Sequence, residues 1–74
     1  MGAKYPILAP KEIIRVLEKF FNFRFVSQKG SHMKYSDGQH TVIIPNHDEV
    51  ARGTLKSILS MSGIDLEDFM NRLK

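Results

Sequence analysis

Three histidines, His32, His40 and His47, are the residues of this chain best suited to transfer protons. An unperturbed imidazole has a pKa of about 6.5, so it acts as either a general acid or a general base near neutral pH. The intervals between the histidines do not match those of metal ligands, and the lack of cysteine excludes a thiolate zinc site. We therefore expect no metal and no other cofactor, and on residue type alone an exposed histidine is more often inert than catalytic.

Positive charge is concentrated in the first half of the chain. Residues 1–36 contain seven Lys or Arg and two Glu, whereas residues 37–74 contain four Lys or Arg and six acidic residues. A basic surface is typical of proteins that bind phosphate groups, although a solvated charged surface would give the same count. The charge distribution is therefore compatible with a phosphate-containing ligand but does not require one.

The elements that position these side chains must fit into a single domain spanning residues 1–74. A composition of 42% hydrophobic and 26% charged residues is typical of a folded globular protein. A domain of this length buries only about 60% of the surface that its unfolded chain exposes, so its core is thin. No apolar run approaches the ~18 residues of a membrane span, and the N-terminus does not resemble a signal peptide. We expect a cytoplasmic protein without membrane contact.

The first periodic segment of the chain has the spacing of a helix. Pro10 is suited to the start of a helix, and Asn22 to ending it in the left-handed conformation. Apolar residues recur between them at three- and four-residue spacing, at Ile13, Ile14, Leu17, Phe20 and Phe21. This pattern predicts an amphipathic helix.

Strand periodicity follows, with turn signals at Lys29-Gly30 and Asp37-Gly38. We expect strands at residues 23–26, 31–36 and 39–44, the last ended by Pro45. Helical spacing then returns at Leu55, Ile58, Leu59 and Met61, closes at Gly63, and resumes after Asp65 as N-cap, with Leu66, Phe69, Met70 and Leu73. The predicted fold is α+β, a three-stranded antiparallel sheet packed on helices in the order α-β-β-β-α-α.

The turns predict which residues face each other. A two-residue turn at Asp37-Gly38 would put Tyr35 opposite His40 and His32 opposite Ile43. For the first hairpin two registers compete, because a two-residue loop would put Arg24 on the apolar face and expose Phe25. A three-residue loop, residues 28–30, does the reverse and is favoured.

These registers place His32 and Lys34 on the face away from the helices. Their predicted neighbours there are Arg24, Val26, Thr41 and Ile43. The apolar pair among these neighbours, Val26 and Ile43, is of the kind that a protein partner would cover.

Three stretches of the sequence resemble the HicA toxins, small RNA interferases with a fold like the double-stranded-RNA-binding domain. They are FRFVSQKGSHMKY at residues 23–35, VIIPNH at residues 42–47 and GTLKSIL at residues 53–59. Asn22 departs from the family, whose members commonly have Gly after the first helix. Because Asn tolerates the left-handed conformation better than other non-Gly residues, the turn is retained.

The resemblance implies a function and a partner. It identifies His32 with the catalytic histidine of the family, whose members cleave messenger RNA without a metal as toxins of type II toxin–antitoxin systems. It also implies a cognate HicB-type antitoxin that covers the sheet face around His32. The alternatives are a non-catalytic RNA-binding module and a protein-interaction domain of the same fold.

RNA cleavage by attack of the 2′-hydroxyl needs a base, an acid and stabilisation of charge on phosphorus. Lys29 or Lys34 is expected to supply the positive charge. His47 is a possible second proton-transfer group, with a plain loop histidine as the other interpretation, and His40 is expected to form a cross-strand surface pair. Candidates for phosphate contacts are Arg24, Lys29, Lys34, Arg52 and Lys56.

Overall fold

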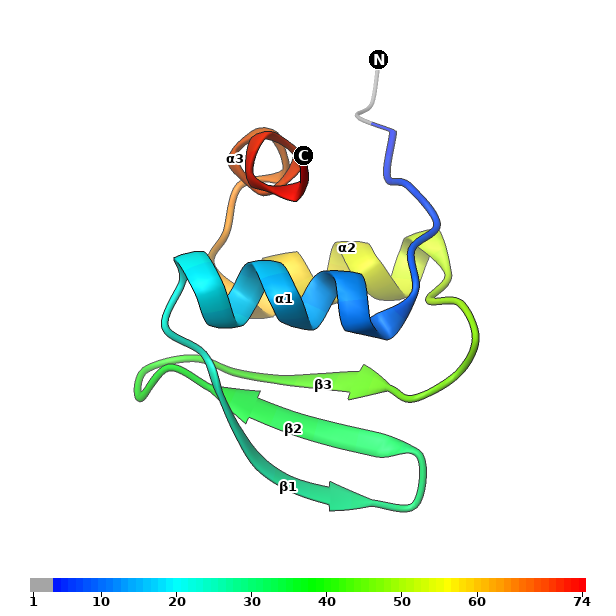
Figure 1. The fold of residues 1–74 in the computed structure, drawn as a ribbon, viewed down its shortest axis with the longest axis vertical. Coiled ribbons are helices and arrows are strands. Elements are labelled where there is room, and N and C mark those ends of the chain that lie inside the picture. The colour runs from blue at the N-terminus through cyan, green and yellow to red at the C-terminus, as the bar shows by residue number, and fades with distance from the viewer. Residues whose placement is uncertain (1–3) are drawn as a thin grey trace.

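Six elements make up the fold in the computed structural model, which describes residues 4–74 (Figure 1). They are α1 (Pro10–Phe20), β1 (Arg24–Lys29), β2 (His32–Ser36), β3 (Thr41–Pro45), α2 (Arg52–Ser62) and α3 (Leu66–Leu73). The strands form one antiparallel sheet in the order β1-β2-β3. The predicted α+β fold and its order of elements are confirmed. The predicted domain also includes residues 1–3, which lie outside the described residues.

The helices lie on one side of the sheet and α3 is farthest from it (Figure 1). Helix α2 packs along β3, and α3 packs on α1. Alternate residues of β2 and β3 point into the core and are buried, as predicted: Met33, Tyr35, Val42 and Ile44. The intervening residues, among them His32, Lys34 and Ile43, are exposed on the opposite face of the sheet.

Helix α1 begins and ends where the sequence predicts. Pro10 is its first residue, and the Glu12 carboxylate accepts a hydrogen bond of 2.8 Å from the backbone N–H of Ala9. Asn22 has a φ of 62°, which confirms the left-handed turn. One prediction is wrong: the Phe20 side chain is exposed rather than part of the core. On the surface its ring lies 5.1 Å from the Arg72 guanidinium and 5.6 Å from the Lys19 ammonium, contacts that favour an aromatic ring at this position.

The predicted register of the second hairpin is wrong by two residues. Tyr35 pairs with Val42 and His32 with Pro45, so the loop comprises residues 37–40. The Asp37 carboxylate closes this longer loop by accepting hydrogen bonds from the backbone N–H groups of His40 at 2.6 Å and Gln39 at 2.8 Å. Because strand residues alternate between faces, a shift of two leaves every side chain on its predicted face.

The predicted three-residue loop of the first hairpin is also wrong. Lys29 pairs with His32, so the turn contains only Gly30 and Ser31. A β-bulge between Phe25 and Ser27 then changes the register. Through this bulge Phe25 pairs with Tyr35 and shares its face, as predicted, although it is 52% exposed at the edge of the sheet.

We predict that Gly63→Ala destabilises the fold. Gly63 ends α2 with a φ of 74°, and an added Cβ would lie 3.2 Å from His40 Nε2. The left-handed backbone alone should lower the free energy of unfolding by about 1–2 kcal/mol, measured by urea denaturation. The matched control is Gly53→Ala within α2, where a Cβ meets no atom within 4 Å. Equal stability of the two variants would contradict this prediction.

We predict that the Asp37 carboxylate makes stability depend on acid pH. The hydrogen bonds from the backbone of His40, and then of Gln39, lower the pKa of Asp37 from 3.8 to about 2. A lowered pKa in the folded state stabilises it above the unfolded pKa, and this contribution is lost as pH falls from 3.8 towards 2.

The measurement is the urea midpoint of wild type and Asp37→Asn at successive pH values. Asn keeps a side-chain oxygen as acceptor but does not titrate. We expect the stability advantage of the wild type to shrink through this acid range. A difference that stays constant would refute the role of the carboxylate charge.

Candidate functional site

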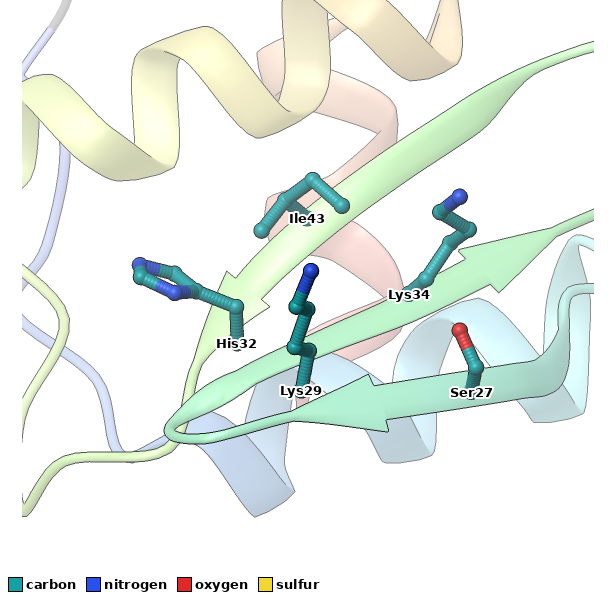
Figure 2. Close-up of a pocket in the computed structure, with 5 residues that line it drawn as sticks. All are labelled: Ser27, Lys29, His32, Lys34 and Ile43. Carbon is teal, nitrogen blue, oxygen red and sulfur yellow. The ribbon is translucent and has the colours of Figure 1, made fainter.

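A hollow of about 330 Å³ opens on the exposed face of the sheet. It is called the cationic hollow here and is lined by Ser27, Lys29, His32, Lys34 and Ile43. Figure 2 shows all five side chains projecting from the same side of the sheet. All three strands contribute to the hollow, so it exists only when they are aligned.

The two-residue turn brings the first cation to the histidine. Because Gly30 and Ser31 alone form the turn, Lys29 belongs to β1 and lies directly opposite His32. Residues opposite each other on antiparallel strands have Cβ atoms about 4.5–5.5 Å apart. Lys29 is thus the nearest cross-strand neighbour of His32 on β1, rather than a residue of the loop.

The same strand pairings determine the positions of the other residues that line the hollow. Lys34 lies two residues along β2 from His32 and therefore on the same face. It pairs with Ser27 on one side and with Ile43 on the other. The hollow therefore combines two ammonium groups, one imidazole and one hydroxyl with an apolar wall.

The charged side chains of the hollow, Lys29 and Lys34, are both cationic. None of the five lining residues is acidic, and no ion pair among residues 4–74 involves Lys29, His32 or Lys34. All three side chains are exposed. Ammonium groups bind phosphate oxygens, and an adjacent imidazole accepts or donates a proton at the same ligand. This arrangement is chemically suited to an anionic ligand at which a proton moves.

Arg24 and Val26 do not lie beside His32 as predicted. The bulge places Arg24 opposite Ser36, at the end of the hairpin far from the turn. One Arg24 guanidinium nitrogen, Nη1, donates to the carbonyl oxygen of Phe23 at 2.9 Å and to that of Glu18 at 3.4 Å. The error has a physical cause, because the predicted neighbours depended on a register that the real turn does not have.

Other predicted residues lie outside the cationic hollow. Arg52 and Lys56 are exposed on α2, and His47 is exposed in the loop after β3. This loop starts next to the site, since Pro45 pairs with His32 and the backbone N–H of Asn46 donates to the carbonyl oxygen of Ser31. The roles of these three residues stay predictions. His40 forms no cross-strand pair, because its ring contacts the Asp37 carboxylate at 3.2 Å inside the hairpin loop.

The sequence reasoning did not identify Ser27, which lines the hollow opposite Lys34. A signal for the correct turn was present in Gly30-Ser31, because Gly at the first position of a two-residue loop is typical of a type II′ hairpin. Gly30 has the positive φ, 59°, that such a turn requires. With this turn, Lys29 and Ser27 face His32 and Lys34.

Two further findings concern ligands and membranes. Within the described residues no group of three His, Asp or Glu side chains is placed to hold a metal ion. None of the helices in residues 4–74 has the length and apolar character needed to cross a membrane.

A known protein family matches most of the chain. The family model described as the HicA toxin of bacterial toxin–antitoxin systems matches residues 10–64. That range runs from the first residue of α1 to just beyond α2, contains every residue of the cationic hollow, and covers well over half of the 74 residues. No curated protein matches the chain significantly. The chain therefore belongs to the HicA toxin family of bacterial toxin–antitoxin systems.

Proposed function

We propose that this toxin is a metal-independent endoribonuclease that cleaves messenger RNA, with His32 as a catalytic residue. The observation that carries the proposal is the grouping of His32 with Lys29 and Lys34 in one exposed hollow that no acidic residue lines. Family membership supports the toxin role, and activity on messenger RNA would be exercised in the cytoplasm.

The proposed reaction uses the RNA as its own nucleophile. The 2′-oxygen attacks the adjacent phosphorus, the bond from phosphorus to the 5′-oxygen breaks, and a cyclic phosphate and a free 5′-hydroxyl form. One group removes the proton of the 2′-hydroxyl and another protonates the leaving 5′-oxygen. His32 performs one of these transfers, while Lys29 and Lys34 stabilise the additional negative charge on the phosphorane oxygens.

The second proton-transfer group must be identified by experiment. His47 is our first choice because its loop begins at Pro45, the residue that pairs with His32. If His47 transfers a proton, His47→Ala removes one limb of the bell-shaped pH profile. If it is a plain loop histidine, the profile is unchanged.

We also propose a HicB-type antitoxin that covers the open sheet face around His32. Its contact area would include the apolar side chain of Ile43, which lines the hollow and is 45% exposed, and would extend along β1 to Val26 at the bulge, which is 54% exposed. Covering this face would exclude RNA from the cationic hollow and thereby inhibit the toxin. Arg24, Arg52 and Lys56 remain candidates for contacts to RNA phosphates beyond the hollow.

We predict that His32→Ala abolishes growth arrest on induction and lowers RNA cleavage in excess chelator by roughly 10²–10⁴-fold, the usual contribution of a general acid or base. The matched control is His40→Ala, which removes the same chemical group at the opposite end of the β2–β3 hairpin. It should retain cleavage. Undiminished cleavage by His32→Ala would reject the assignment, and binding without cleavage by the wild type would favour a non-catalytic RNA-binding module.

We predict that Lys29 and Lys34 each contribute a phosphate contact. In the cleavage-deficient His32→Ala background, Lys29→Gln or Lys34→Gln should weaken binding of single-stranded RNA. Each should also reduce the slope of log Kd against log salt concentration by roughly 0.7, as expected for one phosphate contact. The measurement is a fluorescence-anisotropy titration at several salt concentrations. Lys11→Gln, on α1, is the charge-matched control, and the same slope in all three variants would contradict the prediction.

A further inference from the structure

A second hollow, of about 150 Å³, lies between β3 and α2. It is called the α2 hollow here and is lined by Ile43, Thr54, Ser57, Ile58 and Met61. Ile43 also lines the cationic hollow, so one side chain forms a wall shared by both. Figure 2 shows Ile43 between the His32 and Lys34 side chains on one side and the α2 ribbon on the other. The two hollows are therefore adjacent parts of one surface.

The α2 hollow has a different chemistry from its neighbour. Ser57, Ile58 and Met61 lie three, four and seven residues after Thr54, which puts all four on one face of α2. Ile58 is buried at its base, whereas Met61 is 62% exposed, against the prediction that it joins the apolar face of the helix. None of the five lining residues is charged, and the hydroxyls of Thr54 and Ser57 are their only polar side-chain groups.

A small apolar hollow with two hydroxyls suits a nucleobase. The faces of a base are apolar and polarisable, and its edge carries hydrogen-bond donors and acceptors. A Ser or Thr hydroxyl both donates and accepts, so it can bond to either kind of group. Ile43 and Met61 are placed to contact a base face while Thr54 and Ser57 meet its edge.

We infer that the α2 hollow binds the base of an unpaired nucleotide whose phosphate occupies the cationic hollow. This inference rests on the proposed function in one respect, namely that the ligand is RNA. In RNA the base and the phosphate are joined through one ribose, so an apolar subsite next to a cationic one matches the order of groups along the chain. The base must be unpaired, because paired bases are stacked and their faces are not accessible.

The same hollow could also receive an apolar side chain of a protein partner. Two features favour the base: the presence of two hydroxyls, those of Thr54 and Ser57, and the Ile43 wall that the α2 hollow shares with the cationic hollow. An apolar side chain would leave both hydroxyls without partners inside the contact. Thr54 and Ser57 are therefore the residues that determine base preference.

The test uses trinucleotides with 2′-O-methyl riboses, which lack the nucleophile and are not cleaved. Each of the four bases is placed in turn at the central position and titrated into isotopically labelled His32→Ala protein. We expect methyl signals of Met61 and Thr54 to shift together with the signals of Lys29 and Lys34. One central base should bind on the order of tenfold more tightly than the weakest, which is typical of one good set of base contacts.

The variant arm uses Thr54→Val with Ser57→Ala, which keeps the size of the hollow and removes both hydroxyls. This pair should abolish most of the base preference while phosphate binding persists. Ser60→Ala, on another face of α2, is the matched control and should keep the preference. Circular dichroism melting checks that each variant is folded.

The outcomes separate this inference from the proposed function. Trinucleotide shifts at Lys29 and Lys34 without shifts at Met61 and Thr54 would overturn the inference, as would an unchanged base preference in the double variant. Shifts at Met61 caused only by a protein partner would assign the hollow to protein binding and also overturn it. If the wild type fails to cleave RNA but the trinucleotides still shift Met61, the base subsite stands and the proposed cleavage does not.

Discussion

The pairing of β1 with β2 is the constraint on which both the core and the open face depend. At one end, the two-residue turn sets Lys29 opposite His32. At the other end, Phe25 must share the face of Tyr35, against which its ring packs edge-on with centroids 5.7 Å apart. With strict alternation these two demands exclude each other, since a shift of one residue exchanges the faces. The bulge inserts the single residue that satisfies both, so the cationic surface and the apolar core can occupy opposite faces of one strand pair.

Much of the fold could be predicted because local patterns determine it. Helical spacing, the left-handed Asn22, the Asp65 N-cap and the glycine that ends α2 are all properties of short segments, and the structure has each of them. The register of the second hairpin could not be predicted, because it depends on competing side-chain hydrogen bonds. Gly30-Ser31 indicates the first turn, but the pairing farther along β1 depends on the bulge. The Asp37 carboxylate selects a four-residue loop over the two-residue turn that Asp37-Gly38 suggests. No pattern in the sequence around Val26 indicates that β1 has a bulge there.

At the candidate site, a strand register that was predicted incorrectly still placed the side chains on the correct face of the sheet. The error in the second hairpin was an even number of residues, so His32, Lys34 and Ile43 kept their predicted side of the sheet. The predicted cross-strand neighbours are more sensitive to a register error, because each shift by one residue exchanges one partner for another. Arg24 was therefore placed beside His32 in error, and Ser27 was overlooked. The α2 hollow could not be predicted from the sequence, since it depends on how closely α2 packs against β3, and helical or strand periodicity does not give that distance.

Helix α3 lies outside the range that the family model matches, and it is the helix farthest from the sheet (Figure 1). Arg15 holds it by a 3.0 Å hydrogen bond to the carbonyl oxygen of Leu73, Arg72 lies over the Phe20 ring, and Phe69 is buried in the core. The C-terminal end of the chain consequently emerges at the pole of the molecule opposite β1 (Figure 1). A fluorophore, an affinity handle or a fused reporter attached there would leave the strand surface unobstructed. The fold thus provides its own point of immobilisation for surface-based measurements of RNA or antitoxin association.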